Sequence, residues 1–223
     1  MLDTIDKVDK AETAGGDIAP AVTRSRLKGI AVCGSNPHTK MQAPFGDPGF
    51  AIYACSPDNS PHGLNPQNCS VLPRVDTWFE IHNPVFDKTR PYAYLDWLRN
   101  IPKVYMRDQV AMNLRDANCT PIFPTAVLYN EKAMKERFGP FTFTSTIAFM
   151  MAQAIIDIER LRAAGQTVDV PELPLYGILQ LGKAEYEKQR QGTQNMIWEA
   201  TKSRIKVRVA PESGLFEPPP EDF

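Results

Sequence analysis

The stretch Gly29-Ile-Ala-Val-Cys33, followed by Gly34-Ser-Asn-Pro37, decides the fold class. Its apolar residues stand in an unbroken row, without the alternation that marks a strand with one solvent-facing side. Small and turn-forming residues then end the run. Such runs are typical of strands that are buried on both faces, as in a parallel sheet covered by helices. The stretch therefore predicts an α/β protein.

The same pattern returns along the chain. Further apolar runs occupy residues 50–55, 75–82, 103–106, 173–178 and 205–209. The clearest helical stripe follows Pro140, with Thr142, Thr144 and Ser145 as candidate N-caps and Gly165 as its end; its apolar positions are Ile147, Met150, Met151, Ala154, Ile155, Ile158 and Leu161. We expect further helices at 92–100, 131–138 and 185–203. Strands that alternate with helices predict one Rossmann-like α/β domain over residues 28–216, with a mostly parallel sheet flanked by helices.

Composition limits the class of protein. The chain has 223 residues, a net charge of −1 and 43% hydrophobic residues, which argues against disorder and against a polybasic coat for nucleic acid. We find no apolar run near the roughly 18 residues that span a bilayer, and no signal peptide. The four cysteines have no metal-site spacing. We therefore expect reduced thiols, a cytoplasmic location, no metal and no membrane contact.

Two polar flanks frame the expected domain. Residues 1–27 are expected to form a flexible arm, and residues 217–223 a proline-rich acidic tail. Both flanks are candidate surfaces for a protein partner.

Candidate binding residues stand at strand and helix ends. Gly34, Ser35 and Asn36 follow the first strand, where an open α/β sheet binds its ligand. The expected helix after Pro140 opens with Thr144, Ser145 and Thr146, and a helix N-terminus attracts phosphate. The alternative is that these residues only end a strand and cap a helix. The chain has neither a GxGxxG fingerprint nor a Walker A motif, so we expect neither a standard NAD site nor P-loop chemistry.

Two further sets of residues are candidates for chemistry. Glu80 and His82 lie two positions apart on an expected strand and therefore share a face, where they could act as acid or base, or satisfy each other. Lys202, Arg204, Lys206 and Arg208 alternate near the end of the chain. Arg204 and Arg208 are candidates to neutralise a phosphate, and the alternative is a charged edge strand.

Several blocks together resemble a known family. Residues 28–37 (KGIAVCGSNP), residues 141–155 (FTFTSTIAFMMAQAI) and Leu175-Tyr-Gly-Ile178 are similar to the strand, loop and helix blocks of sialyltransferase-like proteins, which include bacterial CMP-sialic acid transferases and motility-associated proteins. Trp78-Phe-Glu-Ile-His82 and Glu185-Tyr-Glu-Lys-Gln189 resemble blocks of small tailed-phage proteins.

The resemblance implies a nucleotide on Gly34, Ser35, Asn36, Thr144 and Ser145. Two departures argue against sialyl transfer itself: Ile178-Leu179 replaces the family's acidic position, and no histidine follows His82.

Our leading hypothesis is a nucleotide-dependent transferase, and within that class a glycosyltransferase with a nucleotide-sugar as co-substrate. A non-catalytic phage accessory protein that keeps the fold as a binding module is the second hypothesis. A phage enzyme that modifies DNA bases is the third, and it is the one that would make nucleic acid a partner.

Overall fold

The computed structural model describes residues 26–55, 57–64, 71–82, 92–107, 109–179 and 184–216. Within them, seven strands form one sheet in the spatial order β5-β4-β3-β2-β1-β6-β7, and all neighbouring strands run parallel. The strands are β1 (Leu27–Cys33), β2 (Phe50–Cys55), β3 (Thr77–Glu80), β4 (Val104–Met106), β5 (Ala126–Leu128), β6 (Thr167–Tyr176) and β7 (Lys206–Val209). This confirms the predicted Rossmann-like α/β class.

The interior strand β1 shows why its sequence is apolar throughout. Ile30 and Val32 pack on one face of the sheet, and Ala31 and Cys33 pack on the other. All four side chains are buried. Because helices or loops cover both faces, neither alternate position along this strand tolerates a polar residue.

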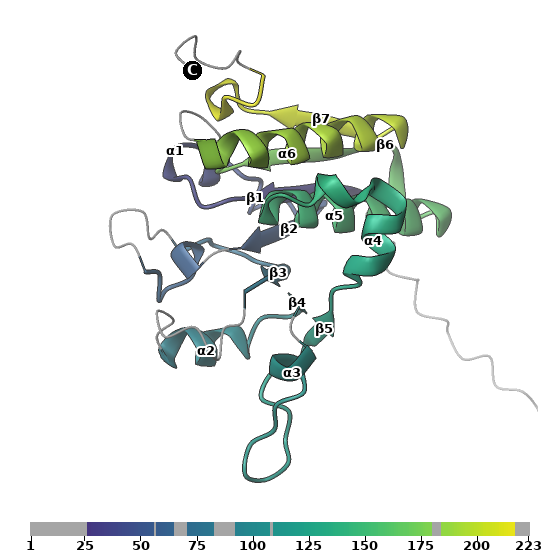
Figure 1. Ribbon diagram of the computed structural model, residues 1–223. Coiled ribbons are helices and arrows are strands. Elements are labelled where there is room, and N and C mark those ends of the chain that lie inside the picture. The colour runs from purple at the N-terminus through teal and green to yellow at the C-terminus, as the bar shows by residue number, and fades with distance from the viewer. Residues whose placement is uncertain are drawn as a thin grey trace, which may run out of the picture.

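Helices lie on both faces of the sheet. The helices are α1 (Pro37–Lys40), α2 (Tyr92–Leu98), α3 (Gln109–Met112), α4 (Glu131–Phe138), α5 (Thr146–Ala163) and α6 (Ala184–Lys202), with short 3-10 turns η1 (Pro57–Asn59), η2 (Pro140–Thr142) and η3 (Pro211–Ser213). α5 packs on β1, β2 and β6, and Figure 1 shows α6 running beside it. α2 contributes Tyr94 and Leu98 to the core of the opposite face. The predicted helices are thus confirmed, each within about two residues of its expected ends.

The strand order places a topological switch beside β1. From β1 the chain adds β2, β3, β4 and β5 in one direction, and it then returns to add β6 and β7 on the other side. Loops that leave β1 and β6 therefore turn to opposite faces and open a crevice at the carboxyl ends of these strands.

Several strand predictions need correction. β5 is a short edge strand that we did not predict, and its Val127 and Leu128 are exposed. β3 spans only Thr77–Glu80 instead of 75–82, so His82 lies outside it, and β6 runs from Thr167 to Tyr176 instead of 173–178.

The last strand is also shorter than the alternating basic residues suggested. β7 begins at Lys206, because α6 continues to Lys202 and the chain then turns at Arg204, which has φ 54°. Two hydrogen bonds close that turn: Arg204 N donates to Thr201 O (2.9 Å), and Ile205 N donates to Ala200 O (3.0 Å). The four basic residues therefore do not share one face of a strand.

The predicted flanks fall largely outside the described residues. Of the expected arm only Arg26 and Leu27 are described, and Leu27 already begins β1. The expected tail at 217–223 lies wholly outside them.

Candidate functional site

A cavity of about 330 Å³ opens at the carboxyl edge of the sheet, beyond the ends of β1 and β6. This volume falls in the range of small-molecule sites in proteins. The loop after β1, the loop after β6 and the start of α5 supply most of its wall. Its lining residues are Gly34, Ser35, Asn36, Pro37, Cys55, Asp58, Ser145, Thr146, Ile147, Gly177, Ile178, Leu179 and Gln189.

The floor of this cavity is a direct backbone contact between the loops after β1 and β6. Gly34 N donates to Tyr176 O, and Asn36 N donates to Gly177 O, both at 2.8 Å. A Cβ built on Gly177 would lie 2.5 Å from Gly34 O, and a Cβ on Gly34 would overlap Gly177 O. The missing side chain of Gly34 thus makes room for the backbone of Gly177.

The start of α5 forms one wall. Ser145 is the N-cap, and its hydroxyl accepts a hydrogen bond from Ala148 N at 3.2 Å. Within the described part of the chain, the N–H groups of Thr146 and Ile147 have no acceptor, as is usual for the first turn of a helix. These donors and the helix dipole favour an anion in the cavity.

Thr144 differs from its two neighbours, since it is not among the residues that line the cavity. Its hydroxyl lies against α6, where a Cβ on Gly192 would overlap it. Of the three predicted hydroxyl residues, Ser145 and Thr146 therefore remain at the cavity.

A second cavity, of about 200 Å³, adjoins the first. Both are lined by Cys55, Asp58 and Thr146, and the second adds Glu80 and His82 from the end of β3. Its other lining residues are Pro57, Leu64, Phe79 and Ile81. The structure thus brings the Gly34–Asn36 loop, the start of α5 and the Glu80–His82 segment to a crevice made of two cavities that share lining residues.

Glu80 and His82 stand in different surroundings. Glu80 is 2% exposed, and one of its carboxylate oxygens accepts a hydrogen bond from Tyr94 Oη. Tyr94 Oη in turn accepts a hydrogen bond from Trp78 Nε1 at 3.0 Å. His82, in contrast, is exposed and lies just past the end of β3. The carboxylate is therefore held in place, whereas the imidazole is open to solvent.

A buried polar cluster beneath the crevice escaped the sequence analysis. Lys40 is fully buried, and its Nζ donates to Asn59 Oδ1 at 3.0 Å. Asn59 Nδ2 donates to Gly34 O at 3.1 Å and to Cys55 O at 2.7 Å. Asn59 therefore fixes η1 against the loop after β1 and against the end of β2. The sequence around Lys40 carries no signal that distinguishes it from a surface lysine.

The two cysteines of this region are poor nucleophiles. Burial raises the pKa of the Cys33 thiol to about 12, although the Lys40 ammonium acts in the opposite direction. Burial also raises the pKa of Cys55 to about 12, reinforced by the Glu80 carboxylate and by Cys33. Since the thiolate is the reactive form, neither residue is suited to attack a substrate at neutral pH.

The predicted phosphate-neutralising arginines lie elsewhere. Arg208 pairs with Glu172 on β6 and lines a separate hollow near Pro211. Arg204 precedes β7, at the amino end of the sheet, and its carbonyl accepts from Arg162 near the end of α5. Because the 18 residues of α5 span about 27 Å, Arg204 is far from the helix start that lines the cavity. The structure therefore corrects their assignment to the crevice.

The charges that line the first cavity are few. Among its described lining residues Asp58 is the charged one, and neither lysine nor arginine is present. Within the described ranges, no group of three or more His, Cys, Asp or Glu is arranged to hold a metal ion. None of the described helices is both long and apolar enough to cross a bilayer.

No protein-family model, curated protein or solved structure matches the chain.

Proposed function

We propose that the protein is a nucleotide-dependent transferase, and that its donor is a nucleotide-sugar. The observation that carries the proposal is the pair of adjoining cavities at the carboxyl edge of the sheet, beside the switch in strand order. Open α/β sheets bind nucleotides at this place. A group-transfer enzyme also needs a second, adjoining compartment for the acceptor, and the smaller cavity offers one.

The larger cavity suits the donor. The N–H groups that begin α5 are donors for a phosphate, and Thr146 adds a hydroxyl to this wall. Ser35 and Asn36 also line this cavity and can hydrogen-bond to a nucleoside. The start of α5, and not Arg204 or Arg208, would therefore neutralise the charge of the donor phosphates.

The smaller cavity suits an acceptor hydroxyl. In the proposed step, the acceptor oxygen bonds to the anomeric carbon of the sugar while the bond from that carbon to the phosphate oxygen breaks. The proton of the hydroxyl passes to His82 or to Glu80, and the nucleotide leaves with its phosphates against the start of α5. His82 is the more accessible base, and Glu80 is held in place by Tyr94.

Thermal denaturation with added nucleotides tests the binding part of this proposal. CMP, UDP, GDP and their sugar conjugates are each added at 1 mM. A ligand at about 100 times its Kd stabilises a protein by about 2.7 kcal/mol, which corresponds to a rise in Tm of roughly 5–10 °C for a chain of this size. If no nucleotide changes the Tm at this concentration, the proposal is wrong.

Two matched N-cap variants locate the site. Ser145→Ala and Asn130→Ala each remove a side chain that caps a helix, α5 and α4 respectively, but only Ser145 lines the cavity. Both variants are expected to lose about 0.5–2 kcal/mol of stability. Only Ser145→Ala should also weaken nucleotide binding. Equal nucleotide affinity in the two variants would place the ligand elsewhere.

Release of nucleotide from the sugar conjugate, with water in place of the acceptor, tests the chemistry. His82→Asn and Glu80→Gln should slow this release without a matching loss of affinity for the donor. His62→Asn is the control, because His62 does not line either cavity. A protein that binds the donor but does not release nucleotide would instead support the binding-module hypothesis.

A further inference from the structure

Asp58 is the charged residue that the linings of the donor and acceptor cavities have in common. It lies in η1, directly after β2, and it lines both cavities. β2 is the neighbour of β1 in the sheet, so η1 stands beside the loop that carries Gly34, Ser35 and Asn36. Asp58 therefore stands where the proposed donor and acceptor compartments share their lining.

The position of Asp58 is set by its neighbours. The side chain of Asn59 bonds to the backbone of both Gly34 and Cys55, as described above. Lys40 Nζ lies 3.4 Å from the carbonyl oxygen of Asp58 and also holds Asn59. Ser60 Oγ donates to Pro57 O at 2.7 Å and so closes the turn. A carboxylate on such a braced turn is preorganised to meet a ligand without rearrangement of the backbone.

The lining of the larger cavity carries two kinds of polar group. The start of α5 offers N–H donors and suits a phosphate. Asp58 offers a negative charge, which repels a phosphate and accepts hydrogen bonds from neutral donors. Two adjacent hydroxyl groups can each donate to one carboxylate oxygen. A ribose 2′,3′-diol has this arrangement, and a 2′-deoxyribose lacks one of the two donors.

We propose that Asp58 binds the ribose diol of the nucleotide, so that the site selects ribonucleotides over 2′-deoxyribonucleotides. This inference rests on the proposed nucleotide binding and adds the class of nucleotide and its orientation. The phosphates face the start of α5, and the ribose faces η1. An enzyme with this preference would draw on nucleotide-sugars built on ribose.

Calorimetric titration tests the inference directly. The wild-type protein is titrated with CMP, UDP and GDP and with the 2′-deoxy counterpart of each. For any base that binds, we expect the ribonucleotide to bind on the order of tenfold more tightly, as for one hydrogen bond to a charged group. Equal affinities for the two sugars would overturn the inference while leaving the proposed function intact. If neither member of any pair binds, the proposed function itself is wrong, and the inference falls with it.

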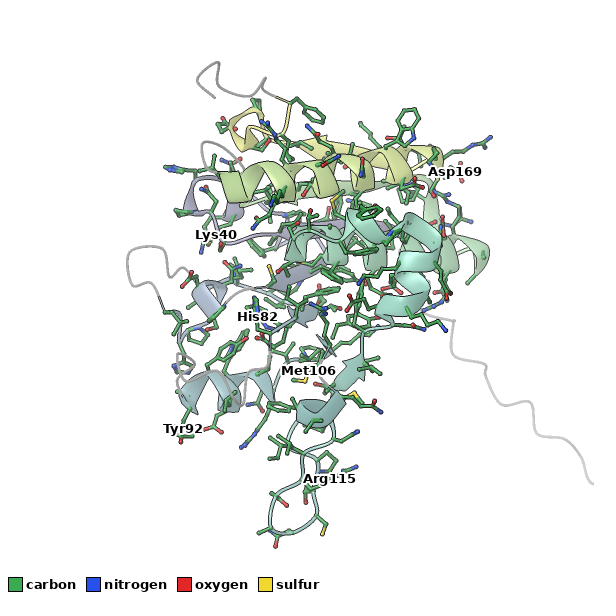
Figure 2. The ribbon with its side chains drawn as sticks, in the orientation of Figure 1. Lys40, His82, Tyr92, Met106, Arg115 and Asp169 are labelled. Atoms are coloured by element: carbon green, nitrogen blue, oxygen red, sulfur yellow. The ribbon has the colours of Figure 1, made fainter. Side chains whose placement is uncertain are left out.

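Asp58→Asn then assigns the selectivity to this residue. We expect the variant to lose roughly tenfold affinity for the ribonucleotide and little for the deoxynucleotide, so that the ratio approaches one. Asp169→Asn is the matched control, because Asp169 is an exposed carboxylate of β6 that lies far from Lys40 (Figure 2). An unchanged ratio in Asp58→Asn, or an equal loss for both sugars, would remove Asp58 from this role. The wild-type comparison decides the selectivity even if the variant does not fold.

Discussion

Replacement of Gly177 by alanine tests the contact on which the crevice is built. Gly177 has φ +63°, and a Cβ there would lie 2.5 Å from Gly34 O and 2.7 Å from Lys40 Cβ. An ordinary carbon–oxygen contact is roughly 1 Å longer, so the loops after β1 and β6 must separate. Their two linking hydrogen bonds of 2.8 Å would then break or lengthen.

The magnitude follows from two costs. A left-handed conformation costs an alanine roughly 1–2 kcal/mol, and the added methyl group in a packed site costs about 1–3 kcal/mol more. Gly177→Ala should therefore lose about 2–5 kcal/mol, which lowers the Tm by roughly 5–20 °C for a chain of this size. Urea denaturation followed by circular dichroism measures the loss of free energy, and the thermal scan checks it.

Gly165→Ala separates the two costs. Gly165 has φ +68°, but no atom lies within 4 Å of a Cβ built there. This control therefore carries the conformational cost alone, about 1–2 kcal/mol. If the two variants lose the same free energy, the contact between Gly34 and Gly177 is not tight, and our account of the cavity floor is refuted. We also expect Gly177→Ala, but not Gly165→Ala, to abolish nucleotide binding.

Two further predictions concern buried groups. Tyr53 Oη donates to Asp157 Oδ2 at 2.7 Å and so links β2 to α5. Tyr53→Phe leaves this buried acceptor unsatisfied and should lower the free energy of unfolding, measured by urea denaturation, by about 1–3 kcal/mol. Tyr176→Phe is the control, since Tyr176 Oη makes no hydrogen bond to another described residue. In the double variant C69S/C119S, only Cys33 and Cys55 remain, and their pKa of about 12 leaves roughly one thiol in ten thousand ionised at pH 8. Ellman's reagent should therefore find almost no reactive thiol in the folded protein and two after unfolding.

Each of these two predictions has an outcome that would contradict it. A loss in Tyr176→Phe as large as that in Tyr53→Phe would mean that the buried hydrogen bond contributes little. Rapid reaction of one thiol in the folded double variant would mean that the crevice floor opens, since Cys55 lines both cavities.

The fold was predictable from the sequence because its strands are buried on both faces. The apolar runs at 29–33 and 50–55 are too short for a buried helix and are bounded by turn residues, and β2 begins and ends where its run does. β5 could not be found in this way, because it has three residues and two of them are exposed at the sheet edge.

The sequence predicted only those parts of the candidate site that lie at the end of a strand or at the start of a helix. The loop at 34–36 and the helix start at Ser145 follow from general rules of α/β folds. The cluster of Lys40 and Asn59 depends on contacts between residues 19 positions apart, which no local pattern records. The error at Arg204 has a similar origin: alternating basic residues suggested a strand, whereas the turn after α6 depends on how that helix packs.

The pairing of β1 with β6 also shapes how the protein is made. Leu27 pairs with Thr167, so 140 positions of chain separate the two partners. At ordinary rates of translation, roughly 7–28 s pass between the synthesis of one and the other. During that interval β1 has no partner strand on the edge where β6 will pair. Of the two loops that form the cavity floor, only the one after β1 has been synthesised. The two loops that form the cavity floor can therefore meet only after β6 has been translated.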